Sequence, residues 1–185
     1  MGYVVTLKKN EEKRILAGNG WVYANEVASI SGKDKNGSLA TVVSSDGRFI
    51  GKGYINHLSK ILVRIFVRDE RSDEEVIKER LLEAVNLRKR LGFSTCCRAV
   101  YAESDLLPGL IVDKYGEALS VQFLTLGMDM RKDFIVECLK DIFAPRAIIE
   151  RSDVAVRQKE GLPLKKGVIY GENISRIETE ENGLK

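Results

Sequence analysis

The sequence has little of the chemistry that metal sites, disulfide frameworks and catalytic triads require. Its 185 residues include one histidine, His57, and three cysteines, Cys96, Cys97 and Cys138. The cysteines are odd in number and lack Cys-x-x-Cys spacing, so we expect neither a zinc site nor a disulfide framework. Reduced thiols in a cytoplasmic protein are the simpler interpretation. A Ser-His-Asp set would depend on that one histidine, and we expect His57 to be a loop or surface residue.

Long apolar runs are also absent. No stretch approaches the roughly 20 apolar residues that are needed to cross a bilayer. The apolar start of the chain soon meets Lys8 and Lys9, so it does not form the core of a secretory signal. No glycine-rich turn joins a strand to a helix in the way that binds a dinucleotide-like ligand. We therefore expect no membrane association and no cofactor bound by these residues.

Positive charge is concentrated in the first part of the chain. Residues 1–72 contain 12 Lys and Arg against 7 Asp and Glu, a net charge of +5, whereas residues 73–185 contain 18 against 20. A basic first unit beside a near-neutral remainder is typical of contact with a polyanion. Basic residues that only solvate a small surface would give the same balance, and charge alone leaves both interpretations open.

Residues 1–72 have the pattern of a small β domain. Short β-like runs alternate with turn signals, and one short helix is predicted over Asn10–Leu16. Gly51 and Gly53 fit a bend where a strand turns a barrel corner. We predict a small closed β-barrel. Its expected strands are Tyr3–Leu7, Trp21–Tyr23, Val27–Ile30, Leu39–Val43, Phe49–Ile55 and Ile61–Val67.

Residues 73–185 predict a mixed α/β domain of hairpins and two helices, so the chain as a whole is expected to be α+β. A capping box at Ser72–Glu75 begins a helix that runs to about Leu91, with Gly92 as its carboxyl cap. Its predicted buried face carries Ile77, Leu81, Ala84, Val85 and Leu91.

A second helix is predicted over Asp129–Phe143. It should end there because Pro145 prevents its extension. The chain ends on a predicted strand at Ile177–Thr179 and an Asn182-Gly183 hairpin turn. A hairpin cut just after its turn suggests an excised fragment. The other expected strands are Arg98–Glu103, Gly109–Asp113, Ala118–Leu124, Ala147–Glu150 and Ile169–Tyr170.

Three blocks of sequence, taken in order, carry a family resemblance. They are Glu12-Lys13-Arg14 with Gly18-Asn19-Gly20-Trp21-Val22-Tyr23, then Ser45-Asp46-Gly47-Arg48-Phe49-Ile50-Gly51-Lys52-Gly53-Tyr54, and then Glu103-Ser104-Asp105-Leu106-Leu107-Pro108-Gly109-Leu110-Ile111-Val112-Asp113-Lys114-Tyr115-Gly116, supported by Glu150-Arg151-Ser152-Asp153. Together they resemble the amino-terminal part of bacterial 23S rRNA (cytosine-5-)methyltransferases of the large-subunit methyltransferase I type.

The resemblance implies that RNA binding and methyl transfer belong to different domains. In that family a PUA domain leads, a central α/β domain follows, and a domain that binds S-adenosyl-L-methionine (SAM) completes the chain. Residues 1–72 would be the PUA-like RNA-binding barrel, and residues 73–185 the central domain, ending where the methyltransferase domain would follow. The SAM site and the catalytic cysteine are therefore expected in the missing domain, and this chain is expected to be inactive by itself.

The sequence departs from the family pattern at two turns. Asn19-Gly20 stands where family members commonly have His-Pro. Leu106 replaces a usual glycine before Leu107-Pro108-Gly109, so a backbone position that tolerates positive φ elsewhere must here suit a Cβ atom.

No residue of the chain is predicted to be catalytic. We expect Cys96, Cys97 and Cys138 to be structural thiols, although Arg98 could lower a thiol pKa. Arg88, Lys89 and Arg90 complement a helix dipole in one interpretation and bind a ligand in the other. The acidic residues are expected to cap turns or form ion pairs rather than to act as acids, bases or metal ligands; the set comprises Glu103, Asp105 and Asp113, and Glu150 with Arg151 and Asp153.

RNA binding is the positive hypothesis, with ribosomal RNA as the partner. Basic residues would contact phosphates and aromatic residues would stack on unpaired bases. For Trp21 a place in the core competes with a stacking role, and for Tyr54 the two are balanced. The predicted RNA-binding residues are Lys8, Lys9, Lys13, Arg14, Trp21, Tyr23, Arg48, Lys52 and Tyr54.

Two other functions fit the same residues. One is a stand-alone PUA-type RNA-binding module without enzyme activity, and the other is a barrel whose basic face meets an acidic protein. The sequence leaves open which nucleotide is modified, which RNA element is bound, and whether the chain is a fragment or naturally short. Since the resembled family can dimerise, a homodimer is a further open expectation.

Overall fold

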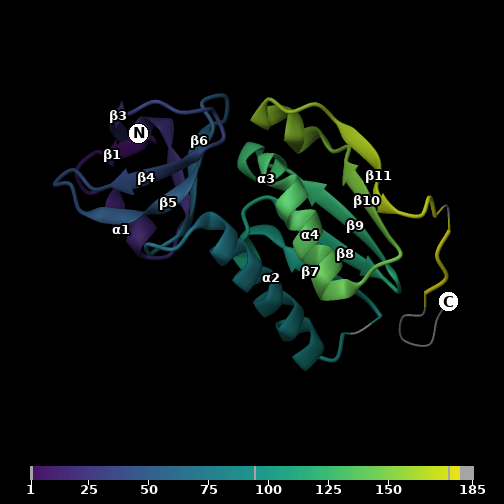
Figure 1. Cartoon of the computed structure of the whole chain (residues 1–185). Helices are drawn as coiled ribbons and strands as arrows, with labels where there is room; N and C mark the ends of the chain where they lie inside the picture. The colour runs from purple at the N-terminus through teal and green to yellow at the C-terminus, as the bar shows by residue number, and fades with distance from the viewer. Residues whose placement is uncertain (1, 94, 175, 180–185) are drawn as a thin grey trace. The chain divides into compact units, whose positions relative to one another are not determined.

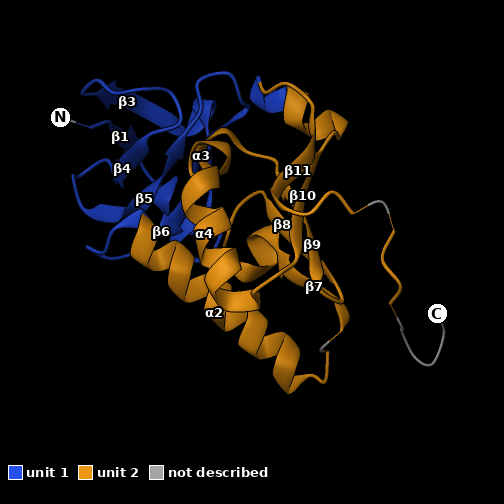
Figure 2. Cartoon of the chain, turned by 45° about the vertical axis from the view of Figure 1, so that its right-hand side comes forward, with its two compact units in different colours: residues 1–73, 159–161 blue, residues 74–158, 162–185 orange. Residues whose placement is uncertain are grey.

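The computed structural model describes residues 2–93, 95–174 and 176–179. The chain forms two compact units (Figure 2): residues 1–73 with 159–161, and residues 74–158 with 162–185. Each unit contains its own β-sheet. The fold is the mixed α and β structure that the sequence predicts.

The first unit is built on a six-stranded sheet with the order β2-β6-β5-β4-β1-β3 (Figure 1). Neighbouring strands are antiparallel, except that β1 and β4 are parallel. The strands are β1 Val4–Leu7, β2 Trp21–Tyr23, β3 Val27–Ser31, β4 Leu39–Val43, β5 Phe49–Ile55 and β6 Ile61–Val67, with helix α1 at Glu12–Leu16 and the 3-10 turn η1 at Ala24–Glu26. All six predicted strands and the short helix are confirmed.

The sheet curls without closing. In the described part of the chain, the edge strands β2 and β3 form no ladder with each other, so the predicted closed barrel is a half-barrel. Strands β1, β2 and β4 bury alternate residues in the core of this unit, because successive side chains of a strand point to opposite faces, whereas β5 and β6 bury consecutive residues. This core contains Val5, Leu7, Ile15, Val22, Ala40, Val42, Ile50, Ile55, Leu62, Val63 and Ile65.

Gly53 is required where β5 crosses closely over β6. A Cβ atom at this position would lie 2.2 Å from the Arg64 carbonyl oxygen, far inside a van der Waals contact. The register between β5 and β6 also shifts between Lys52 and Gly53, which marks a bulge. The expected strand bend is therefore present, and the residues after it no longer follow simple alternation.

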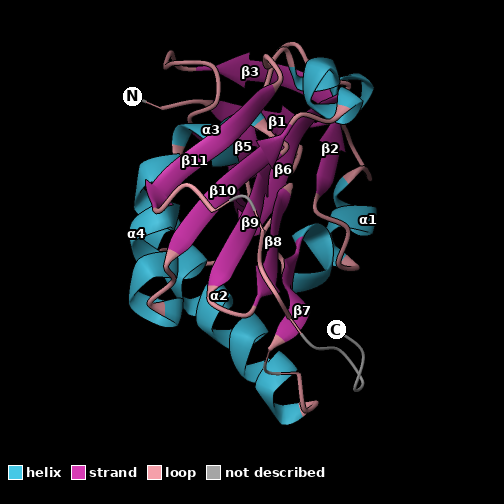
Figure 3. Cartoon of the chain, turned by 90° about the vertical axis from the view of Figure 1, so that its right-hand side faces the viewer, coloured by secondary structure: helices cyan, strands magenta, loops and turns pink. Residues whose placement is uncertain are grey.

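The second unit contains a five-stranded sheet with the order β11-β10-β9-β8-β7. Figure 3 shows α2 and α4 together on one face of this sheet. The elements are α2 Asp73–Arg90, β7 Cys96–Tyr101, the 3-10 turn η2 Ala102–Asp105, β8 Leu110–Tyr115, β9 Ala118–Phe123, α3 Leu126–Met130, α4 Lys132–Phe143, β10 Ala147–Ser152, the 3-10 turn η3 Ala155–Glu160 and β11 Lys165–Gly171.

Several boundaries differ from the prediction, among them that β11 begins at Lys165 rather than Ile169; three other differences have a clear physical reason. The second helix is two helices, because the backbone at Arg131 leaves helical geometry and both ends α3 and begins α4. Helix α2 ends at Arg90, so Leu91 lies outside it and is 63% exposed rather than buried. Strand β7 ends at Tyr101, because Ala102–Asp105 turns into the 3-10 helix η2.

The carboxyl cap of α2 is confirmed at Gly92. Its φ of 85° is the left-handed value that glycine adopts without strain, and the Phe93 amide donates back to the Arg88 carbonyl. At the end of the chain, the described residues Ile177–Thr179 form no strand. The predicted Asn182-Gly183 turn lies outside the described residues.

A buried guanidinium joins four segments of the second unit. Arg157 is fully buried and donates to the Phe123 carbonyl, to the Pro163 carbonyl at 2.6 Å and to Asp129 Oδ1 at 2.8 Å. Lys132 extends the network, since its Nζ lies 3.4 Å from Asp129 and 2.7 Å from Glu150. The expected Arg151–Asp153 pair is present, but Glu150 pairs with Lys132 instead, because its side chain lies on the helix-covered side of β10.

Asp129 is held ionised by this network. Burial raises its pKa, but the hydrogen bond from Arg157 and the charges of Lys132, Arg157 and Lys165 outweigh burial, so the pKa is below its ordinary value. A carboxylate with a lowered folded-state pKa stabilises the fold above its unfolded pKa, and this contribution disappears as the pH falls through the folded-state pKa.

We predict that Asp129→Asn lowers the free energy of unfolding by about 2 kcal/mol at neutral pH, because Arg157 then keeps a buried charge without its counter-ion. Urea titration across pH measures this. The difference from wild type should shrink as the pH falls below the ordinary aspartate pKa and through the lower folded-state pKa of Asp129, where the wild-type carboxylate becomes protonated. Asp153→Asn removes an exposed pair and is the control, with little effect expected; equal effects of the two variants would contradict the network.

Leu106 is a left-handed residue with a φ of 56°. This is the position at which the resembled family usually has glycine, and a Cβ atom there is strained. We predict that Leu106→Gly raises the free energy of unfolding by about 1 kcal/mol, because the side chain is 56% exposed and its loss removes little burial. Urea unfolding tests this, with Leu106→Ala as the control that keeps the Cβ. A stability gain in the alanine variant alone would contradict the explanation.

Candidate nucleic-acid interface

Three predicted phosphate contacts lie within one short segment of the first unit. Lys8 and Lys9 follow β1, and Lys13 lies in α1. All three are exposed. Lys8 Nζ donates to the Asn25 carbonyl at 2.7 Å, whereas Lys9 and Lys13 make no side-chain hydrogen bond or ion pair in the part of the chain that the structure describes. We call Lys8, Lys9 and Lys13 the α1 lysine cluster; its charges face solvent and are available to an anion.

Arg14 holds α1 against the sheet. Its Nη2 donates to both carboxylate oxygens of Glu26, at 2.6 and 2.8 Å, and to the Trp21 carbonyl at 2.8 Å. The nearly buried Glu26 also accepts from the Tyr23 amide at 2.8 Å. The predicted phosphate contact at Arg14 therefore competes with a charge-assisted pair inside the protein, and we assign Arg14 a structural role first.

The two predicted stacking residues of β2 are half-buried. The Arg64 guanidinium lies over the Trp21 ring at 5.7 Å, and the Arg14 guanidinium lies over the Tyr23 ring at 5.5 Å. An arginine thus occupies one face of each ring, as in cation–π pairs. A stacking role on the other face stays a prediction for both residues.

Tyr54 is a correction, because it presents almost no surface to a base. Its side chain is 6% exposed and its ring packs against Phe66 at 4.9 Å between centroids. The hydroxyl donates to Asp73 at 2.7 Å, which satisfies its polar end. The bulge beside Gly53 turns Tyr54 inward, so it belongs to the core.

Arg48 and Lys52 differ in availability. The Arg48 side chain is 69% exposed in the β4–β5 turn and pairs with Asp46 at 2.9 Å. Hydrogen bonds from Ser44 and Arg48 lower the pKa of Asp46, so this pair persists at neutral pH. The Lys52 side chain is 16% exposed, and its Nζ donates to the Arg71 carbonyl at 3.1 Å. A phosphate would meet Arg48 readily but would have to displace an internal bond at Lys52.

Sequence reasoning missed Glu160, which belongs to the first unit although about 100 residues separate it from its partners. Its carboxylate accepts from Ser59 at 2.7 Å, from Arg64 at 2.8 Å and from Asn56 at 3.0 Å. This buried group fixes Arg64 beside Trp21. No local pattern signals such a long-range contact.

Cys97 and Cys138 have the properties of structural thiols, whereas the expectation for Cys96 stays a prediction. Burial raises the pKa of Cys97 despite the nearby charges of Lys114 and Arg88, and burial likewise raises the pKa of Cys138. Raised pKa values keep these two thiols protonated and weak as nucleophiles. His57, as expected, lies exposed in the β5–β6 loop, with its ring against Tyr3.

The carboxylates near η2 serve as turn and ion-pair groups. Asp105 accepts from Arg88 at 2.5 and 2.7 Å and from the Tyr101 amide at 2.6 Å, and Asp113 pairs with Arg98 at 2.8 Å. Within the described ranges, no three His, Cys, Asp or Glu side chains are placed to hold a metal ion. No helix among the described residues is long and apolar enough to span a membrane.

Comparison with known proteins first gives the class of domain. Residues 5–68 match the family model for the PUA-like domain. Two solved structures share the fold, and each covers 99% of this chain. One is described as "a putative sam-dependent methyltransferase from Streptococcus mutans" (TM-score 0.78, 17% identity, 47% of that chain), and the other as "a putative methyltransferase complexed with SAH" (TM-score 0.80, 16% identity, 46% of that chain).

Curated relatives then give the family resemblance. The chain is 38% identical to ribosomal RNA large subunit methyltransferase I of Shewanella amazonensis, over 100% of the chain and 48% of the relative. The proteins of the same name from Tolumonas auensis and Aeromonas salmonicida are 36% and 35% identical with the same coverage. The resemblance predicted from the sequence is confirmed. The chain spans about half the length of the curated relatives it matches.

Proposed function

We propose that this chain is the RNA-binding, substrate-positioning region of a SAM-dependent rRNA cytosine-5 methyltransferase. The observation that carries the proposal is the exposed α1 lysine cluster on a PUA-like domain. Ammonium groups in solvent attract phosphates without reading sequence, so the cluster supplies affinity and orientation rather than base specificity.

The α1 lysine cluster lies on and directly before a helix that is anchored to the sheet. The Ile15 side chain of α1 is fully buried, and Arg14 of the same helix forms an ion pair with Glu26. Arg48 adds an exposed guanidinium in the β4–β5 turn, with its Asp46 partner also at the surface. Trp21 and Tyr23 are the remaining predicted contacts to unpaired bases, while Lys52 and Tyr54 support the fold.

Methyl transfer is assigned to a part of the protein outside this sequence. Relatives about twice as long carry the methyltransferase name, and burial raises the pKa of the Cys97 and Cys138 thiols, which makes these two poor nucleophiles. SAM would bind in that other part. The whole protein would act in the cytoplasm, where ribosomal RNA is its substrate; homodimer formation stays an expectation of the resemblance.

We predict that Lys8→Gln, Lys9→Gln and Lys13→Gln together weaken the binding of a 23S rRNA fragment and flatten its salt dependence. Loss of three phosphate contacts should reduce the slope of log affinity against log salt by about 2 for a single-stranded site. Filter binding across a salt series measures the slope. The triple variant Lys33→Gln, Lys35→Gln and Lys60→Gln has the same net charge and is the control. Equal slopes for the two triple variants would contradict an interface at α1.

We also predict that the purified chain transfers no methyl group from radiolabelled SAM to 23S rRNA. Titration of SAM into the chain should give no saturable heat signal above the buffer control. Scintillation counting and calorimetry measure these two outcomes. Methyl transfer by this chain, or saturable SAM binding in calorimetry, would contradict the proposal that methyl transfer takes place in another part of the protein. RNA binding is measured in a separate experiment.

A further inference from the structure

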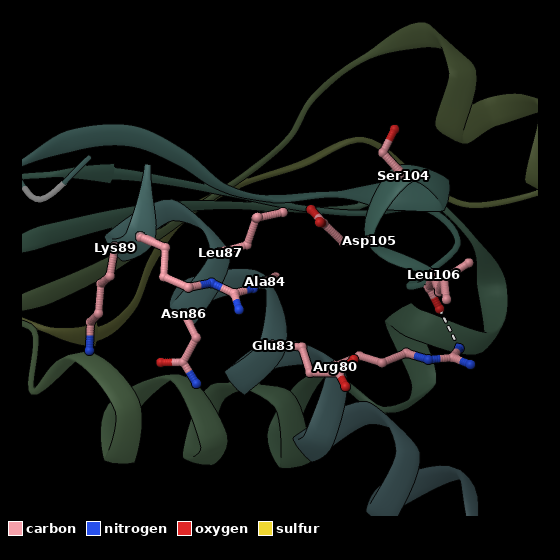
Figure 4. Close-up of a pocket in the computed structure, with 10 residues that line it drawn as sticks. Arg80, Glu83, Ala84, Asn86, Leu87, Lys89, Ser104, Asp105 and Leu106 are labelled. Carbon is pink, nitrogen blue, oxygen red and sulfur yellow. Dashed lines mark hydrogen bonds between the residues drawn. The ribbon is translucent and has the colours of Figure 1, made fainter. Parts of the chain in front are cut away.

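A groove of about 740 Å³ lies wholly within the second unit, between the outer face of α2 and the η2 turn (Figure 4). Its size is in the range of small-molecule sites. Figure 4 shows Arg80 and Leu106 toward one end and Lys89 toward the other. Within residues 73–185, the sequence left ligand binding open at Arg88, Lys89 and Arg90, and the resemblance does not predict this groove.

The floor of the groove is apolar. Ala84, Leu87 and Leu106 line it, and Leu87 and Leu106 are both partly exposed there. Asn86 and Ser104 stand beside these side chains and offer an amide and a hydroxyl. Flat apolar surface with adjacent donors and acceptors suits an unpaired nucleobase, which stacks through its face and hydrogen-bonds through its edge.

The rim of the groove is positive. Lys89 and Arg90 line it and form no ion pair among the described residues. Asp105, one of two acidic residues in the lining, is already neutralised by the two hydrogen bonds from Arg88. The second acidic residue of the lining is Glu83. The two cations Lys89 and Arg90 therefore outnumber the one carboxylate that is not neutralised. A ligand with negative charge is favoured over a cationic or neutral one.

The wall formed by η2 is fixed before any ligand arrives. Arg80 donates to the Leu106 carbonyl at 2.6 Å, and Arg88 ties Asp105 to α2. Ala102 and Leu106 have left-handed φ values of 42° and 56°, which the surrounding hydrogen bonds maintain. A preorganised wall lowers the entropy cost of binding.

We propose that this groove binds a single-stranded segment of RNA, with one unpaired base against Leu87 and Leu106 and the flanking phosphates at Lys89 and Arg90. The inference rests on the proposed function and extends RNA contact from the PUA-like domain to the second unit. RNA is favoured over an acidic peptide because the same chain carries a PUA-like domain and because Asn86 and Ser104 can pair with a base edge.

The test compares two double variants with equal charge. Lys89→Gln with Arg90→Gln removes the rim charges, and Lys78→Gln with Lys166→Gln removes two exposed charges outside the groove lining. The probe is a uridine-rich single-stranded RNA that carries 4-thiouridine. We expect the groove variant to bind about tenfold more weakly, with a salt slope lower by about 1.4, and the control to match wild type. Melting temperatures verify that both variants fold.

Photocrosslinking gives a second readout. Wild-type protein should crosslink 4-thiouridine to the peptides that contain Leu87 or Leu106, and the groove variant should lose these crosslinks. Equal affinity and slope for the two double variants, or crosslinks confined to residues 1–73, would overturn the groove proposal. Binding of an acidic peptide by the groove without any effect on RNA would overturn it as well. If the α1 lysine variant still loses RNA affinity in those cases, the proposed function stands; absence of RNA binding by wild type would remove both.

Discussion

The pair between Arg14 and Glu26 is the contact on which the proposed interface depends. A helix of five residues such as α1 has no stability of its own in water. Ile15 anchors the helix because its side chain is buried. The Arg14 guanidinium fixes the orientation of the helix, because it donates both to the Glu26 carboxylate and to the Trp21 carbonyl. Lys13 therefore lies in a helix that is fixed to the sheet, and Lys8 and Lys9 lie in the short segment that leads into it.

Internal hydrogen bonds also determine which other basic side chains remain available to RNA. Two of the predicted phosphate contacts, Arg14 and Lys52, are occupied by hydrogen bonds inside the protein, and Glu160 holds Arg64 in the same way. Among the described residues, the α1 lysine cluster and the carboxyl end of α2 are two of the places where cations remain exposed, and Lys9, Lys13, Lys89 and Arg90 form no ion pair there. Each lies beside residues that can receive a base, which is why both are assigned to RNA rather than to solubility alone.

Local patterns predicted the elements well, whereas long-range contacts determined which side chains remain available. Strands β4, β5 and β6 have the predicted limits, because alternation and turn residues define them locally. The inward turn of Tyr54 depends on a bulge in the pairing of β5 with β6, which residue order does not reveal. The hydrogen bonds of Glu160 and the groove between α2 and η2 likewise join residues far apart in the sequence, and the helix break at Arg131 has no local sequence signal.

Hydrogen exchange on the free and RNA-bound chain tests the central claim most directly. With a 23S rRNA fragment bound, the account predicts slower amide exchange over residues 8–17, because phosphates on the α1 lysine cluster damp the opening of that helix. Unchanged exchange over residues 8–17 at saturating RNA would contradict an interface on the first unit.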